Sequence, residues 1–161
     1  MRKIFAFLLT FIMALSTTCV AFAGEMPTIS NTHPAEYEYF DDGSYIVTTI
    51  TEEPTVSFAR ATSTKTASKT ATYKSSSGAS LWSVTVTGTF SYNGSSAKCT
   101  AVTGSASSNS SYWKVSSPSC SKSNASASAT ATGKQYNTSG TITRSVSRTA
   151  TLSCSASGKL S

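Results

Sequence analysis

The strict alternation of hydroxyl-bearing and apolar residues between positions 82 and 92 limits what this chain can fold into. Every odd position from 83 to 91 holds Ser or Thr, and the even positions hold Trp82, Val84, Val86, Gly88, Phe90 and Tyr92. Successive side chains of a β-strand point to opposite faces, so a period of two sorts these residues into two faces. Thr is β-branched and favours an extended backbone. The segment therefore predicts a strand with one buried face and one hydrated face.

The same alternation recurs from residue 60 to the end, where 46 of 102 residues are Ser or Thr. In residues 124–136 Ala alternates with Ser or Thr, which predicts a closely packed inner face. The last predicted strand carries on one side Ile142, Arg144, Val146, Arg148, Ala150, Leu152 and Cys154. The two arginines either lie at the rim with their stems along the sheet, or a bulge shifts the register there.

No helical period of 3.6 residues occurs in this part of the chain, and turn residues separate the alternating segments. The pattern predicts an all-β fold: a single immunoglobulin-like β-sandwich of about six to eight antiparallel strands. A Thr-rich outer face is a normal feature of such strands and needs no functional explanation.

The N-terminus has the three parts of a secretory signal peptide. Arg2 and Lys3 precede an apolar run over residues 4–15, and Ala-Phe-Ala ends at Ala23. Residues 1–23 are predicted to be the signal peptide, with cleavage between Ala23 and Gly24 and release of the mature chain outside the cell. The alternative is an N-terminal membrane anchor, for which the apolar run is short.

Charge divides the mature chain into two parts. All seven acidic residues lie between Glu25 and Glu53, and eleven of the basic residues lie from Arg60 onward. We therefore divide it into an acidic arm, residues 24–59, and a basic Ser/Thr-rich β-sandwich domain, residues 60–161. The arm either solubilises the protein, or lies on the basic domain as an extra hairpin or detachable pro-segment. In a third interpretation the basic side chains meet an anionic partner: wall polymer, glycan or membrane surface.

The arm contains one hairpin signal. Asp42-Gly43 separates two β-prone runs, 37–40 and 44–50, and Asp-Gly supports the positive backbone angles of a tight turn. Pro54 is expected to end the second run. His33, in a polar stretch of the arm, is expected to be solvated.

Three cysteines remain after the predicted cleavage. Cys99 and Cys154 flank predicted strands, and we predict a disulfide between them that closes a long loop. Closing a loop of this length with a disulfide adds roughly 4 kcal/mol to the free energy of unfolding, because it lowers the entropy of the unfolded chain. Cys120 lies in "SSPSCSKS", which is predicted to be an exposed turn. It is either a free thiol or part of an intermolecular disulfide.

The basic domain lacks the side chains of most catalytic sites. From residue 60 to the end there is no Asp, Glu or His. General acid–base catalysis, glycoside cleavage and catalytic triads normally need these groups. Carboxylates also hold calcium and magnesium, and zinc sites use His or paired Cys. We expect a non-enzymatic protein with no metal, no cofactor and no nucleic-acid partner.

Several segments resemble a group of small secreted proteins of Firmicutes, mostly clostridial gut bacteria. They are the signal, "YFDDGSYIVTTI", "TKTASKTATYKSSSGASLWSVTVTGTFSYNGSSAKCT", "YWKVSS" and "SRTATLSCSASGKLS". The resemblance implies secretion from a Gram-positive cell and supports the pairing of Cys99 with Cys154, whereas Cys120 is an addition to the usual pattern. It implies no activity.

Two functional hypotheses follow. The first is a secreted, non-enzymatic module that acts by surface contact at the bacterial cell envelope or in the extracellular milieu. The second is a toxin-like or antimicrobial protein whose acidic arm is a pro-segment.

Overall fold

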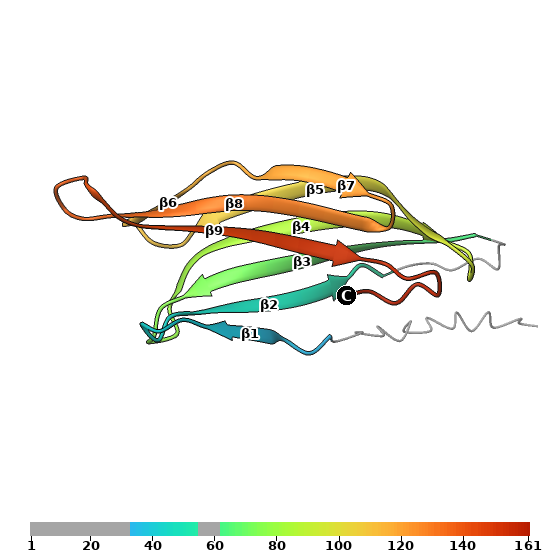
Figure 1. Ribbon diagram of the computed structural model, residues 1–161, viewed down its shortest axis with the longest axis horizontal. Helices are drawn as coiled ribbons and strands as arrows, with labels where there is room; N and C mark the ends of the chain where they lie inside the picture. The colour runs from blue at the N-terminus through green and yellow to red at the C-terminus, as the bar shows by residue number, and fades with distance from the viewer. Residues whose placement is uncertain (1–32, 55–61) are drawn as a thin grey trace, which may run out of the picture.

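Two facing antiparallel β-sheets make up the residues that the computed structural model describes, 33–54 and 62–161 (Figure 1). The first sheet contains β1 (Glu36–Tyr39), β2 (Tyr45–Glu52), β3 (Ser63–Lys74), β4 (Ser80–Tyr92) and β5 (Ala97–Ser108). The second contains β6 (Trp113–Val115), β7 (Ser119–Ser123), β8 (Ser126–Tyr136) and β9 (Ile142–Ser153). The predicted all-β class is confirmed. The predicted signal peptide, with Ala23 and Gly24, lies outside the described residues.

The chain completes one sheet before it starts the other. The first sheet has the strand order β1-β2-β3-β4-β5, so every strand pairs with its neighbour in sequence. In the second sheet β8 pairs with β9 along one edge and with β6 and β7 along the other. The strands β1, β5 and β9 are therefore sheet edges. None of the described residues forms a helix that is long and apolar enough to cross a membrane.

The core lies between the sheets and follows the predicted alternation. The even-numbered residues of β4 are buried from Trp82 to Phe90 as expected, and Trp82 is 1% exposed. Facing them are the small side chains of Ala127, Ala129 and Ala131 on β8. A methyl group on Gly133 would lie 2.5 Å from Trp82 Cε2. Small residues on β8 thus make room for the large ones on β4, because a tightly packed core allows no overlap.

One inward position was predicted wrongly. Ile142 is 49% exposed, although Val146, Ala150 and Leu152 of the same strand are at least partly buried. The register of the β8–β9 ladder shifts between Gln135 and Tyr136, where Tyr136 pairs with Ile142. The alternation of the strand therefore does not extend to its first residue.

Hydroxyl groups bond across the strands on the outer faces. On the first sheet the Oγ atoms of Thr66–Thr89, Ser68–Thr87 and Thr70–Thr85 lie 2.7–3.1 Å apart. The second sheet has the same arrangement between β8 and β9, in the pairs Ser126–Ser153, Ser128–Thr151 and Thr130–Thr149. Cross-strand side-chain pairs stabilise a sheet. The high Ser and Thr content thus has a structural use.

The predicted hairpin around Asp42-Gly43 is present and is part of the first sheet. Gly43 has φ = +77°, and its amide donates to Phe40 O at 2.9 Å. The strand β2 pairs with β3 along its whole length, and Ile46 is buried in the core. The first sheet therefore runs across the predicted division between residues 59 and 60.

Candidate functional site

Ion pairs join the acidic hairpin to basic side chains of the two sheets. Arg148 Nη2 lies 2.6 Å from Glu38 Oε2, and Arg144 pairs with Asp42. Because β1 and β9 are edge strands of opposite sheets, these pairs connect the sheets along one open side. Both arginines keep the inward parity of β9, and their guanidinium groups end at carboxylates. Both alternatives for this strand are observed in part: the two arginines lie at the rim, and the register of the ladder shifts next to Arg144, between its partner Gln135 and Tyr136.

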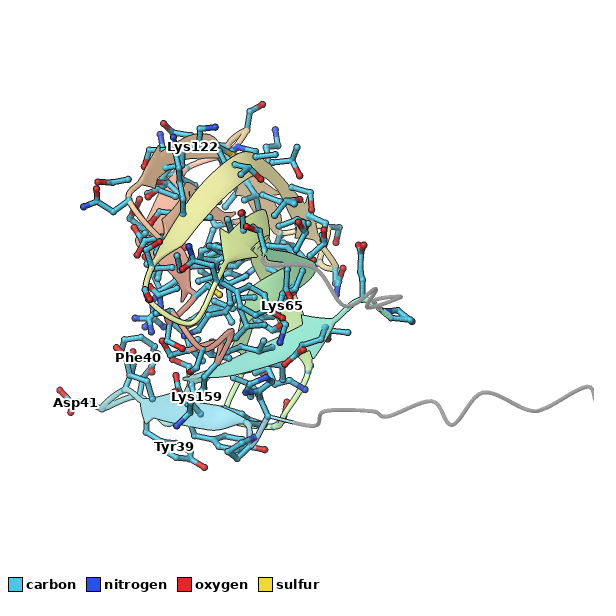
Figure 2. The ribbon with its side chains drawn as sticks, turned by 90° about the vertical axis from the view of Figure 1, so that its right-hand side faces the viewer. Tyr39, Phe40, Asp41, Lys65, Lys122 and Lys159 are labelled. Atoms are coloured by element: carbon cyan, nitrogen blue, oxygen red, sulfur yellow. The ribbon has the colours of Figure 1, made fainter. Side chains whose placement is uncertain are left out.

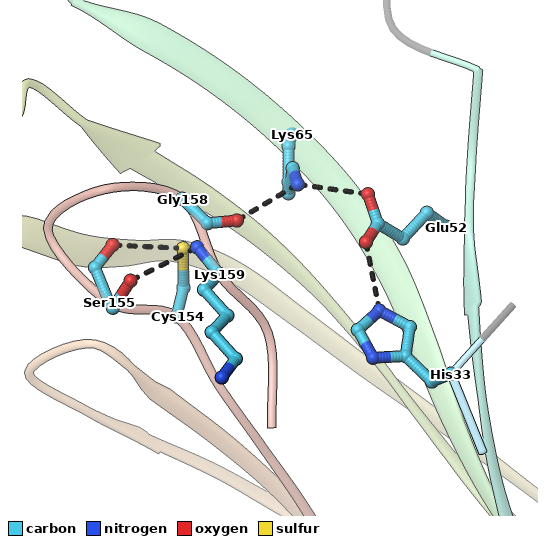
Figure 3. Close-up of polar contacts among 7 residues, drawn as sticks. All are labelled: His33, Glu52, Lys65, Cys154, Ser155, Gly158 and Lys159. Atoms are coloured by element: carbon cyan, nitrogen blue, oxygen red, sulfur yellow. Dashed lines mark hydrogen bonds and ion pairs between the residues drawn. The ribbon is translucent and has the colours of Figure 1, made fainter. Parts of the chain in front are cut away.

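A second group of charges lies at the other end of β2 (Figure 3). Glu52 accepts from Lys65 Nζ at 2.9 Å and contacts His33 Nε2 at 2.9 Å, and Lys65 also donates to Gly158 O. The side chain of His33 is only 21% exposed. The expectation of a solvated His33 is therefore wrong, because the end of β2 brings a carboxylate within reach of the imidazole.

The strand ends beside Asp42 enclose a hollow of about 390 Å³, here called the end pocket. The turn before β2, the turn between β3 and β4, and the segment before β6 meet there. Three aromatic side chains contribute to its wall, from Tyr73, Tyr112 and Trp113. Tyr112 is 55% exposed, and the other two are buried. The pocket thus has a buried aromatic floor and an accessible ring at its rim.

A chain of polar contacts fixes one wall of the end pocket. The Tyr73 hydroxyl donates to Ser44 Oγ at 2.8 Å, and Ser44 Oγ donates to Asp42 Oδ1 at 2.5 Å. Arg144 donates to the other oxygen of Asp42, and its guanidinium carbon lies 5.4 Å from the centroid of the Tyr73 ring. The hydrogen bond from Ser44, followed by that from Arg144, lowers the pKa of Asp42 to about 2.

Two other polar groups of the pocket remain available to a ligand. Among the described residues, neither the side-chain amide of Gln135 nor the hydroxyl of Tyr112 has a hydrogen-bond partner, although both side chains line the pocket. An amide offers both donors and an acceptor, and a phenol offers one of each. The pocket therefore combines aromatic surface with several kinds of hydrogen-bonding group.

A fall in pH should lower the free energy of unfolding through protonation of Asp42. The pKa of Asp42 is depressed when folded, so its contribution to stability is complete above its unfolded pKa and is lost as pH falls through its folded pKa. We expect this loss between about pH 4 and pH 2, and a smaller loss over that range in Asp42→Asn. Carboxyl-carbon NMR of Asp42 should titrate with a midpoint near pH 2. A midpoint near the ordinary value for Asp would contradict the Ser44–Asp42–Arg144 contacts.

The three cysteines of the described residues are free thiols in the structure. Cys99 and Cys154 are buried, and their amides donate to neighbouring carbonyls, Asn124 O at 2.7 Å and Ala125 O at 2.9 Å. Burial raises the pKa of both thiols. The predicted disulfide is not formed here, and its formation during export stays a prediction.

Cys120 is exposed, as predicted, but it lies in strand β7 and not in a turn. Its backbone pairs with Ala129 of β8, and a methyl group on Gly104 would lie 2.5 Å from its Sγ. The sulfur therefore rests against β5. The sequence "SSPSCSKS" did not predict this strand, because the five residues of β7 show no alternation of apolar and polar side chains.

A row of tyrosines lies on the outer face of the first sheet, away from the end pocket. The ring centroid of Tyr39 is 5.4 Å from that of Tyr45 and 6.4 Å from that of Tyr37. Tyr39 is 70% exposed, and Figure 2 shows it pointing away from the body of the protein while Phe40 points toward it. These rings provide matched controls for tests of Tyr112.

The sequence analysis discussed two residues of this pocket, Asp42 for its turn and Arg144 for its side of the last strand, and it linked neither to a pocket. Tyr112, Gln135 and Arg144 come from separate segments, and no spacing in the sequence links them. Within the described residues no group of His, Cys, Asp and Glu is arranged to hold a metal ion. The comparisons with known proteins found no match for this chain among protein-family models, curated proteins or solved structures.

Proposed function

We propose that the protein is a non-enzymatic binding module that works outside the cell and holds a sugar unit of a glycan in the end pocket. The observation that carries this proposal is the combination in one hollow of an exposed Tyr112 ring, an unpartnered Gln135 amide and a fixed Asp42–Arg144 pair. The volume lies in the range of about 300–1,000 Å³ that small-ligand sites usually have.

The chemistry of a sugar suits these groups. One face of a sugar ring carries C–H groups that pack on an aromatic ring, and its edge carries hydroxyls that both donate and accept hydrogen bonds. Tyr112 offers the aromatic surface, and Gln135 offers an amide. Charged groups make stronger hydrogen bonds than neutral ones, so Asp42 and Arg144 add affinity for hydroxyls.

The low pKa of Asp42 agrees with a pocket that binds a sugar and does not cleave it. A general acid or base works best with a pKa near the operating pH, whereas the pKa of Asp42 is lowered to about 2. Glycoside hydrolysis generally uses two carboxyl groups, and Asp42 is the one carboxyl group among the described residues that line the pocket. The predicted signal peptide supports action outside the cell, at the envelope or beyond it.

Substitution of Tyr112 tests the pocket. We expect Tyr112→Ala to weaken binding to glycans selected from an array by about ten-fold or more, because the sugar loses its stacking surface. Tyr39→Ala removes an equally large exposed ring outside the pocket and should leave affinity unchanged. Gln135→Ala should also weaken binding. Calorimetry with the selected glycan would give the three values.

Two results would contradict the proposal. The first is an array on which the folded protein binds no glycan. The second is equal affinity of the wild type and Tyr112→Ala, which would place the binding surface elsewhere. Unfolding curves of each variant should accompany the measurement, and Tyr112→Ala is expected to fold because the ring is exposed.

A further inference from the structure

Two lysines lie directly opposite each other on the outer face of the second sheet. Lys114 of β6 and Lys134 of β8 are register partners, next to the inward pair Trp113 and Gln135. Like charges in this position repel each other and destabilise the strand pair. Among the described residues no carboxylate forms an ion pair with either lysine. The pair therefore concentrates positive charge that no carboxylate of residues 33–54 and 62–161 neutralises by an ion pair.

The two lysines line a shallow hollow of about 540 Å³, here called the lysine hollow. Lys114 Nζ lies 4.9 Å from the centroid of the Tyr136 ring, which holds it over the hollow by a cation–π contact. Ser116 Oγ accepts a hydrogen bond from the Thr132 amide at 3.0 Å, so its own proton is free to donate. Two ammonium groups and a hydroxyl donor suit an oxyanion.

The lysine hollow and the end pocket are neighbours across one strand pair. Trp113 and Gln135 line the end pocket, and the residues next to them in the chain, Lys114 and Lys134, line the lysine hollow. The strand β6 is short and pairs only with β8, so it forms an edge of the sheet. A polymer that passes around this edge can reach both hollows.

We propose that the lysine hollow binds an anionic substituent, a carboxylate, sulfate or phosphate, carried by the same glycan whose sugar unit occupies the end pocket. This inference rests on the proposed function and narrows its ligand to acidic polysaccharides. The proposal is supported by the lysine pair, whose unneutralised positive charge is complementary to such a substituent. The strand pair β6–β8 contributes residues to both hollows and so places them next to each other.

Dextran sulfate and dextran test the anion site, because they share a backbone and differ in charge. We expect the wild type to bind immobilised dextran sulfate more tightly than dextran, with affinity that falls as salt rises. The double variant K114Q/K134Q should lose about ten-fold of this affinity at low salt, and the slope of log Kd against log salt should fall by about one to two. The matched variant K98Q/K159Q removes the same charge from exposed lysines elsewhere and should keep most of the affinity.

The outcomes separate this inference from the proposed function. Equal losses in the two double variants, or no binding of dextran sulfate by the wild type, would overturn the lysine hollow as a site. Tighter binding to phosphatidylglycerol vesicles than to dextran sulfate would overturn the assignment to a polysaccharide. A third outcome is that the protein binds no glycan on the array while K114Q/K134Q selectively loses affinity for dextran sulfate. That outcome would reject the end pocket as a sugar site and keep the lysine hollow as an anion site.

Discussion

A chain that begins at residue 62 is expected to lose the sharp thermal unfolding transition of the chain that begins at Gly24. Without the hairpin, β3 becomes a bare edge strand of twelve residues, because its ladder with β2 is lost. The core loses Ile46, and the buried hydroxyl of Tyr73 loses its partner Ser44. Bare edges promote aggregation, and an unpaired buried hydroxyl costs about 1–3 kcal/mol.

Four basic side chains would lose their acidic partners in the same truncation: Lys65, Lys69, Arg144 and Arg148. Far-UV circular dichroism and size-exclusion chromatography should therefore show an aggregated or non-cooperative species. A soluble monomer that melts within a few degrees of the longer chain would contradict this result. It would also favour the alternative hypothesis of a toxin-like protein with a detachable pro-segment, since the domain would then be stable without its arm.

Replacement of Trp82 by Ala is expected to lower the free energy of unfolding by about 3–5 kcal/mol, a range typical of buried large aromatic residues. The indole is 1% exposed, is in ring contact with Tyr73 and lies against Gly133. Its removal leaves a cavity that the small residues of β8 cannot fill. Within the part of the chain that the structure describes, the buried Nε1 has no hydrogen-bond partner, so loss of that group offsets a part of the cost.

Urea denaturation followed by circular dichroism would measure this effect. Tyr39→Ala is a suitable control, because its ring is exposed and its loss removes only the contacts with Tyr37 and Tyr45, which should lower the free energy of unfolding by about 0.5–1.5 kcal/mol. A decrease of under about 1 kcal/mol for Trp82→Ala would mean that the space between β4 and β8 is not tightly packed.

The long strands were predictable because the alternation of residues that specifies each strand lies within the strand itself. Every second residue is buried from Trp82 to Phe90 in β4 and from Ala127 to Gly133 in β8, so the alternation in the sequence directly indicates the two faces. The hairpin at Asp42-Gly43 was predictable for the same reason, since Gly43 supplies the positive φ of the turn. The strand β7 was missed because it is held by the β8 ladder and has no alternation of its own.

The candidate site was much less predictable. The sequence displayed a block of acidic residues and a set of basic ones, but it did not indicate that Arg144 meets Asp42 or that Arg148 meets Glu38. The walls of the end pocket come from residues as far apart as Asp42 and Arg144. The opposition of Lys114 and Lys134 depends on the register of β6 against β8, which no local signal specifies.

By itself the sequence determined the class of fold, because the periods of hydroxyl and apolar residues act over a few positions and leave no helical alternative. It also determined which side chains are available for chemistry, since composition does not depend on folding. Only the tertiary structure decided which of these side chains meet. Sheet pairing and the facing of two sheets bring together residues that are far apart in the chain, and their contacts depend on the path of the whole chain.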